Sequence, residues 1–382
     1  MRRSLLALLP LILNACLGSN TEFETRIPTI DIATTTTPTK APFPEFTPTT
    51  EPPPTPTETP TEIPTSAPPL EEPVQLIPLT GLPAFPDAEI SGMAWHGDKL
   101  IILPQYPRKY ISTLGSASLF ALSKKEILDY LAGSHQGAPE ITQIPVYNSD
   151  VAAQVPGYEG FEAIAFNGDQ VYLTIEANYQ GAMQGYLIQG IFLPGENSIT
   201  LDPETLIQIP TPVQIFNAAY ETLFIADKQV ITLFEANGKG LNSEPNAFVK
   251  EGTSQEFTSL DLFNIEYRLT DATDLDSEGR FWVLNVFVPI EFWFYSNSDP
   301  IIDQYGQGST HAANIHVERL LELKYNDGQI SLSGNPPIQI ELIDDANPRN
   351  WEALVRIDDL GFLAMTDTYP GTILGFIHKP QE

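Results

Sequence analysis

The chain has 382 residues, with 19 lysines and arginines against 49 aspartates and glutamates, so its formal net charge is −30 at pH 7. This charge argues against nucleic-acid binding by counterion release and against binding to anionic lipid surfaces through basic patches. The single cysteine excludes an intramolecular disulfide, a cysteine-type zinc site and an iron–sulfur cluster.

Residues 1–15 have the features of a secretion signal. Two arginines precede an apolar stretch over residues 5–13, which is too short to span a bilayer. The sequence Leu-Asn-Ala-Cys that ends at Cys16 resembles the bacterial lipoprotein box, which implies cleavage before Cys16 and lipidation of that residue. An ordinary signal peptide with an incidental cysteine is the alternative. We therefore expect an extracytoplasmic lipoprotein, at the cell surface or in the periplasm, anchored to a membrane through Cys16.

Residues 16–75 have the composition of a disordered linker. The 56 residues 20–75 include 14 prolines and 16 threonines and few large apolar side chains. Such a segment cannot bury enough apolar surface to fold, so we expect it to be extended. It would tether one folded domain over residues 76–382, which is long enough for a substantial core.

The domain is dominated by a recurring β-hairpin pattern rather than by amphipathic helices. The pattern is a polar or acidic residue, a short apolar strand, a tight turn with Gly or Asp, and a second apolar strand that ends in a polar residue. Copies occur at residues 91–105, 162–176, 271–285 and 352–367, and a degenerate copy starts at Gln214. Each copy is followed by one or two further strand-like segments.

Four-strand units that recur at intervals of about 50 to 80 residues are typical of propeller blades. We therefore predict an all-β fold, a β-propeller with five blades, or six if one copy has lost its pattern. One strand follows the last copy and residues 74–79 form a spare strand before the first. We expect this N-terminal strand to complete the last blade, which removes two exposed edges. A β-sandwich is the alternative, because alternation of polar and apolar residues does not distinguish the two folds.

The polar residues that open and close each hairpin should share one rim of the propeller. They are Ser91 with Gln105, Glu162 with Glu176, Asp271 with Asn285, Glu352 with Asp367, and Gln214 with Asp227 or Lys228. If the first strand of each hairpin is innermost, carboxylates converge on one mouth of the channel, where they repel one another unless a cation or shared protons compensate. Capping and solubilising roles are the alternative.

An oxygen-only ligand set suits calcium better than zinc. The candidate calcium ligands are Glu162, Glu176, Asp271, Asn285, Glu352 and Asp367.

Cationic and aromatic residues lie beside these positions in the sequence. Arg108, Lys109 and Arg349 could hold a phosphoryl or carboxylate group of a substrate, or could pair with the carboxylates. The insertion over residues 286–314 is rich in aromatic residues, among them Trp293. We expect it to form a lid over the mouth that contributes to substrate binding, or a surface flap that packs its own side chains.

Two blade motifs resemble those of the phytase-like propeller family with esterase-like activity. They are Phe161-Glu162-Ala163-Ile164-Ala165 with Thr174-Ile175-Glu176, and Asn350-Trp351-Glu352-Ala353-Leu354 with Met365-Thr366-Asp367. The resemblance covers about residues 76–378. It implies a secreted, hydrolytic propeller with acidic residues at the central channel. It carries over to Glu162, Glu176, Glu352 and Asp367, which match the motif, and less closely to Asp271 and Asn285. The family usually has Gly after each Glu, whereas this chain has Ala163 and Ala353.

These observations lead to two functional hypotheses. The first is a calcium-dependent hydrolase of a phosphoester or carboxylic ester, in which a metal-bound water is the nucleophile and Glu162 and Glu352 are ligands or base. The alternative is a non-enzymatic propeller that displays a binding face for a surface ligand at the end of its tether.

Overall fold

The structure is a computed structural model that describes residues 68–85, 87–111, 117–326 and 328–380. Every described residue belongs to one compact unit, Pro64–Glu382. The predicted signal peptide, Cys16 and most of the predicted linker lie outside the described residues.

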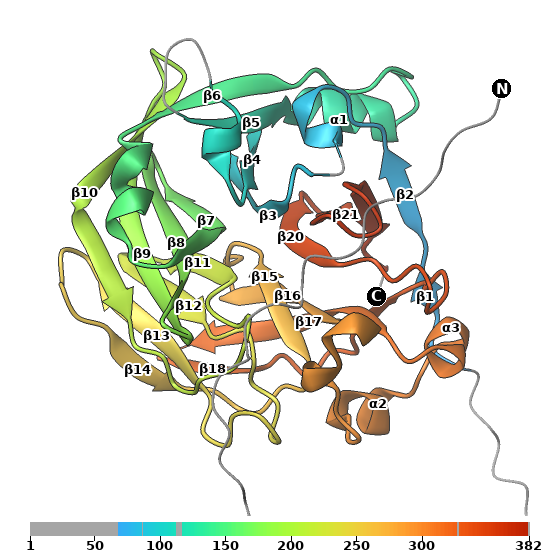
Figure 1. Ribbon diagram of the computed structural model, residues 1–382. Helices are drawn as coiled ribbons and strands as arrows, with labels where there is room; N and C mark the ends of the chain where they lie inside the picture. Colours follow the sequence, from blue (N-terminus) through green and yellow to red (C-terminus); the bar gives the residue numbers. More distant parts are fainter. Residues whose placement is uncertain (1–67, 86, 112–116, 327, 381–382) are drawn as a thin grey trace, which may run out of the picture. The chain divides into compact units, whose positions relative to one another are not determined.

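Five blades surround a central axis (Figure 1). Their inner strands are β3 (Ile90–His96), β7 (Tyr158–Asn167), β11 (Thr222–Ala226), β15 (Arg268–Ala272) and β20 (Trp351–Ile357). Neighbouring inner strands contact one another in chain order, and β20 contacts β3, so the ring is closed. The predicted all-β propeller with five blades is confirmed, and the described part of the chain contains no sixth blade.

Three or more strands complete each blade outward from its inner strand. Blade 1 adds β4 (Lys99–Pro104), β5 (Ala117–Ser123) and β6 (Thr142–Tyr147), and blade 2 adds β8 (Gln170–Tyr179), β9 (Ala182–Leu193) and β10 (Ser198–Ile209). Blade 3 adds β12 (Gln229–Leu233), β13 (Asn246–Glu251) and β14 (Thr258–Asp261). Blade 4 adds β16 (Arg280–Phe287), β17 (Val317–Asn326), β18 (Gln329–Leu332) and β19 (Ile338–Ile340). Blade 5 adds β21 (Gly361–Thr366), β22 (Leu374–His378) and β2 (Val74–Ile77).

The core consists of five apolar clusters, one between each pair of neighbouring blades. Phe224 of blade 3 packs on Phe281 of blade 4 with ring centroids 4.4 Å apart, and Trp282 of blade 4 meets Phe362 of blade 5 at 5.2 Å. Full burial of a side chain of this size contributes roughly 1.5–3 kcal/mol to the free energy of unfolding. Each sheet is apolar on both faces, so all of these faces are buried only when the sheets close into a ring.

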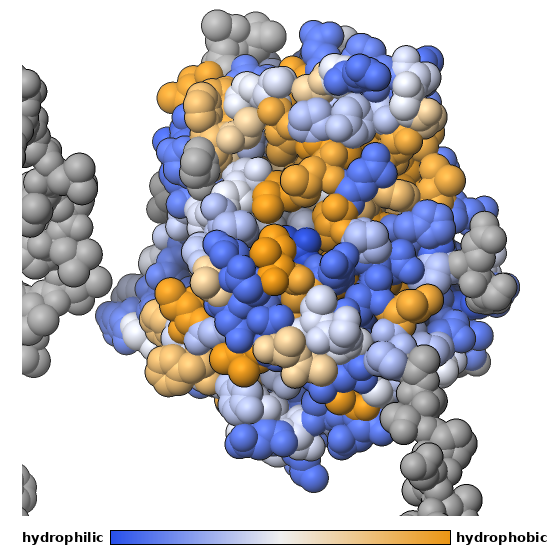
Figure 2. Space-filling view, turned by 90° about the vertical axis from the view of Figure 1, so that its right-hand side faces the viewer, coloured by the Kyte–Doolittle hydropathy of each residue, from blue (hydrophilic) through white to orange (hydrophobic). Residues whose placement is uncertain are grey.

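The N-terminal strand β2 closes the last blade, as predicted. Val74 pairs with Ile377 and Ile77 with Leu374 in an antiparallel ladder. Figure 2 shows the side of the propeller on which β2 lies in Figure 1, where apolar side chains gather among polar ones. The strand β1 (Glu71–Glu72) pairs in parallel with β19 of blade 4. Glu71, Glu72, Val74 and Gln75, which the sequence analysis placed in the linker, are thus paired in sheets.

The third hairpin differs from the prediction. Its strands are β11 and β12, and Asp227 lies in the turn between them with a φ of 54°. Gln214 binds the backbone N and O of Met183 in blade 2. The prediction that Gln214 and Asp227 or Lys228 mark a rim is wrong, because the apolar strand begins eight residues after Gln214.

Helices are short and lie in the connections. They are α1 (Lys124–Leu131), α2 (Pro300–Tyr305), α3 (Ser309–Ala313), and the 3-10 turns η1 (Leu82–Ala84), η2 (Pro107–Lys109), η3 (Ser149–Gln154) and η4 (Pro289–Phe294). Among the described residues, no helix has the length and apolar character needed to cross a membrane.

Candidate functional site

The inner strands begin at one end of the axis, and carboxyl groups gather there. We call this end the acidic mouth and define it by Glu162, Glu176, Glu221, Glu235, Glu291, Glu352 and Asp367. Most of them line a pocket of about 90 Å³ together with polar residues of blades 1, 4 and 5. In blades 2 and 5 the inner strand carries a bulge at Glu162 and at Glu352. A bulged residue leaves the regular ladder, which allows its side chain to turn toward the axis.

Arg268 is the centre of the acidic mouth. It is the first residue of β15, it is 2% exposed, and its guanidinium pairs with carboxylates from blades 3 and 5 and from η4. Nη1 donates to Glu291 at 2.7 Å and Nη2 to Glu352 at 2.9 Å, while Nε donates to Glu235. Glu221 lies 3.2 Å from Nη2. The planar fork of a guanidinium suits such multiple pairing.

One guanidinium does not neutralise seven carboxyl groups, so several of them must hold protons. Burial raises the pKa of Glu162 to about 7, and the negative charges of Glu235 and Asp367 add to the rise. Burial also raises the pKa of Glu352 to about 8, although Arg268 opposes the rise. The pKa values of Glu176 and Glu221 are raised well above their usual range for the same reason.

Neighbouring amides hold two of the carboxyl groups that line the pocket, Glu162 and Glu352. Gln105 Nε2 donates to Glu162 Oε1 at 3.1 Å, and Asn350 Nδ2 donates to Glu352 Oε1 at 2.6 Å. Two other buried carboxyl oxygens of the mouth, Glu235 Oε2 and Asp367 Oδ1, have no hydrogen-bond partner among the described residues. Glu162 and Glu352 are thus oriented, while acceptor capacity remains open around them.

The structure brings four of the six predicted ligands together and leaves two out. Asp271 lies deeper, where its carboxylate accepts hydrogen bonds from the backbone N–H groups of Ala272, Leu354 and Met93. Asn285 is buried within blade 4, where it binds the side chain of Arg319 and two backbone carbonyls. The prediction that this pair shares the rim with Glu162 is wrong.

A shift in register explains the position of Asp271. The bulge of β15 falls at Thr270, so Thr270 takes the place that Ser91 and Glu352 have in their blades. Thr270 Oγ1 donates to Trp351 O, and Ser91 Oγ donates to Phe161 O, each at 2.6 Å across the interface with the next blade. Asp271 is therefore one residue further along the axis, and it joins strands of blades 1, 4 and 5 across the channel.

The predicted substrate-binding residues have different surroundings. Arg349 is 4% exposed and donates from Nε to Glu318 at 2.8 Å, so it is a structural ion pair. Lys109 pairs with Glu89 near the pocket and lies 4.6 Å from the centre of the Tyr106 ring. Arg108 is exposed on η2. Trp293 lies in η4, two residues after Glu291, and its buried indole N–H has no partner among the described residues.

Sequence reasoning missed Glu221, Glu235 and Arg268. Glu221 and Glu235 are separated by 14 residues, which is also the separation of Glu162 and Glu176, so the spacing alone could have identified them. Arg268 had no comparable signal, because it occupies a rim position where the other blades have acidic or neutral residues.

The described residues do not fit a calcium site well. They contain no group of three acidic or histidine side chains arranged as a metal site requires. Arg268 provides positive charge at the point where the sequence analysis expected calcium, and it already engages Glu352.

No protein-family model and no curated protein matches the chain. Among solved structures, a putative glycoside hydrolase from Parabacteroides distasonis ATCC 8503 is 11% identical over 85% of this chain and 96% of that chain, with a TM-score of 0.43. An exo-1,5-alpha-L-arabinanase from a bovine ruminal metagenomic library is 11% identical over 76% of this chain and 94% of that chain, with a TM-score of 0.39. The Bombyx mori GH32 beta-fructofuranosidase BmSUC1 is 9% identical over 82% of this chain and 65% of that chain, with a TM-score of 0.42. The names of these three proteins are those of glycoside hydrolases, not phytases. At sequence identities of 9–11%, the similarity concerns the fold alone.

Proposed function

We propose that the acidic mouth hydrolyses a neutral substrate by acid and base catalysis with Glu162 and Glu352. The observation that carries this proposal is that both carboxyl groups face one pocket and have pKa values raised to about 7 and about 8. Near pH 7, Glu352 is mostly protonated and can donate a proton to the leaving oxygen. Glu162 is partly ionised and can accept a proton from the attacking water.

The charge of the mouth favours a glycosidic bond over a phosphoester. Arg268 is fully engaged by carboxylates, and Arg349 is held by Glu318, so a phosphoryl group would meet negative charge without a free buried cation. The hydroxyl groups of a neutral sugar can donate to the open carboxyl oxygens, and a pair of carboxyl groups is the usual apparatus for glycoside hydrolysis. A carboxylic ester is the second candidate, and the phosphoester predicted from the sequence is the least favoured.

A substrate panel tests the proposal. Nitrophenyl glycosides, carboxylic esters and phosphates are compared on the purified protein and on the variants Glu162→Gln and Glu352→Gln. We expect turnover of at least one glycoside and a loss of roughly 10²-fold or more in kcat in either variant. The matched control is Glu196→Gln, in an exposed turn of blade 2. Turnover that is unchanged in both mouth variants would contradict the assignment, and binding without turnover would favour the display hypothesis.

We also propose that the protein binds calcium and that Cys16 carries a lipid anchor. Calcium titration followed by thermal unfolding decides the first, because an ion that binds only the folded state raises the Tm. The substitution Cys16→Ala decides the second, since loss of lipidation should move the protein from the membrane fraction to the soluble fraction.

A further inference from the structure

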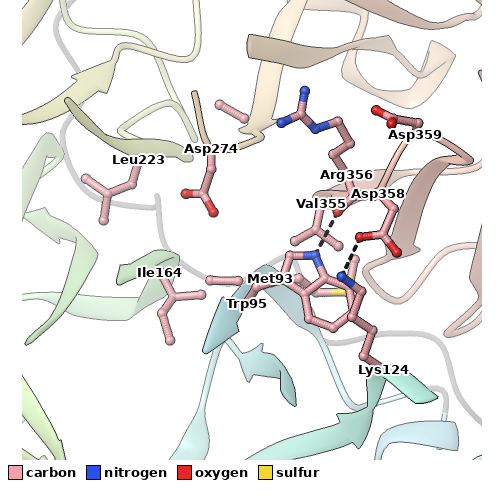
Figure 3. A pocket seen from close by; sticks show the side chains of 12 residues that line it. Met93, Trp95, Lys124, Ile164, Leu223, Asp274, Val355, Arg356, Asp358 and Asp359 are labelled. Carbon is pink, nitrogen blue, oxygen red and sulfur yellow. Dashed lines mark hydrogen bonds and ion pairs between the residues drawn. The ribbon is translucent and has the colours of Figure 1, made fainter. Parts of the chain in front are cut away.

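A second pocket lies at the opposite end of the axis (Figure 3). We call it the opposite pocket. Its volume is about 240 Å³, and all five inner strands or the residues directly after them contribute to its wall. Asp271 separates it from the acidic mouth, because its carboxylate binds the backbone of three blades across the axis. The two sites are therefore distinct.

The floor of the opposite pocket is apolar. Met93, Ile164, Leu223, Ala272 and Val355 are all buried and come from five different inner strands. One wall is the indole of Trp95, whose Nε1 donates to the backbone oxygen of Arg356 at 2.8 Å and fixes the ring. Such a floor offers burial to a compact hydrocarbon group.

Two of the charged groups at the rim are already paired with each other. Lys124 Nζ lies 2.5 Å from Asp358 Oδ1 and 5.4 Å from the centre of the Trp95 ring. Figure 3 shows this pair beside the indole. It forms part of the wall and does not require a ligand.

Arg356, Asp274 and Asp359 are the remaining charged groups of the rim. Arg356 Nη1 lies 3.8 Å from Asp276 Oδ2 in a long ion pair, while the other oxygen of Asp276, Oδ1, accepts the backbone N–H groups of Glu278 and Arg280. Asp274 is exposed at the rim, and among the described residues its side chain makes no hydrogen bond and no ion pair within 4.0 Å. Figure 3 shows both side chains on the same side of the pocket. Desolvation raises the pKa of Asp274, and Arg356 opposes the rise, so each lies within the electrostatic reach of the other.

We propose that the opposite pocket binds an apolar α-amino acid as its zwitterion. The guanidinium fork of Arg356 matches a carboxylate, Asp274 matches an ammonium group, and the apolar floor with Trp95 takes the side chain. A zwitterion carries no net charge, so the net charge of −30 does not repel it.

Isothermal titration calorimetry with L-valine, L-leucine and L-phenylalanine on the purified chain tests this inference. We expect at least one of them to bind. Its amide, which lacks the carboxylate, and its N-acetyl derivative, which lacks the ammonium group, should each bind at least tenfold more weakly. Binding of none of the three amino acids, or equal binding of the blocked derivatives, would overturn the inference.

Substitutions in the opposite pocket test whether the amino acid binds there. Arg356→Gln and Asp274→Asn should each weaken amino-acid binding by tenfold or more. Arg280→Gln, which removes a half-buried arginine paired with Glu278 outside the pocket, should change it less than twofold. Glu352→Gln tests the acidic mouth separately and should leave amino-acid binding within twofold. Unchanged binding in both pocket variants would place the ligand elsewhere and refute the assignment, whatever the outcome of the hydrolysis assays.

Discussion

At the scale of single residues, the acidic mouth depends on how one cation is shared. Arg268 is surrounded by Glu221, Glu235, Glu291 and Glu352, and its side chain is 2% exposed. When one partner of a buried charge network is removed, the remaining charges are left uncompensated. The resulting loss of folding stability is larger than the stability that the intact network provides relative to an apolar core. Burial raises the pKa values of Glu221, Glu235 and Glu352, so the negative charge that Arg268 compensates depends on pH.

Arg268→Met should lower the free energy of unfolding by about 3–5 kcal/mol at pH 7.5, because buried carboxylates lose their countercharge. The loss should be smaller at pH 5, where more of the carboxyl groups are protonated. Urea unfolding at the two pH values measures both effects. Arg108→Met, at an exposed position, is the control and should change stability by less than about 0.5 kcal/mol. An equal loss at both pH values would contradict the charge argument.

The protein should lose stability as the pH rises from 5 to 9. Glu162 and Glu352 have folded-state pKa values of about 7 and about 8, above the ordinary value of 4.5. Their contribution is therefore fully present below pH 4.5 and is lost as the pH rises through 7 and 8. The Tm of Glu352→Gln should depend less on pH over this range and should exceed that of the unmodified chain at pH 9. A Tm profile of the variant parallel to that of the unmodified chain would refute this account.

At the scale of elements, ring closure depends on a strand that is distant in sequence from the blade it completes. β2 lies beside β22; its Val74 is half-buried, Gln75 and Leu76 are exposed, and Ile77 is buried in the core. Ile77 is 2% exposed, whereas Leu76 is 59% exposed. The neighbouring Glu71 strengthens the closure, because it accepts hydrogen bonds from Thr310 and His311, and these donors lower its pKa to about 2 against the effect of burial.

Ile77→Ala should destabilise the propeller by about 2–5 kcal/mol, the usual cost of truncating a buried isoleucine. Leu76→Ala, one position away on the exposed face of the same strand, should cost less than about 0.5 kcal/mol. Chemical unfolding of the two variants measures the difference. Similar losses in the two would mean that β2 does not pack on blade 5 as described.

At the scale of the whole molecule, the net charge of −30 acts on the folded state through self-repulsion. The repulsion between exposed carboxylates is screened over about 10 Å at 0.1 M salt, whereas the buried network at Arg268 is screened much less.

We expect the Tm to rise as sodium chloride increases from 20 mM to 500 mM, because screening weakens the surface repulsion more than the buried ion pairs. Differential scanning calorimetry at several salt concentrations measures the change. Arg268→Met should show the same dependence on salt if the effect comes from the surface. A Tm that falls with salt would indicate that attractive pairs dominate the surface charges.

The sequence by itself determined the local and periodic features of this protein. The alternation of apolar and polar residues indicates the strands, and the tight turns indicate the hairpins. The recurrence of the hairpin predicts a propeller of five or six blades, and the contacts between the inner strands decide for five. The position of Glu162, Glu176, Glu352 and Asp367 at the hairpin ends places them at one rim.

Only the tertiary structure decided which side chains meet. A single bulge at Thr270 moves Asp271 from the rim to the axis, and the sequence pattern does not reveal where a bulge falls. The role of Arg268 was also hidden, because its partners Glu221 and Glu352 lie 47 and 84 residues away in the chain. Contacts of that kind arise from the arrangement of blades around the axis, which brings together residues that no local pattern connects.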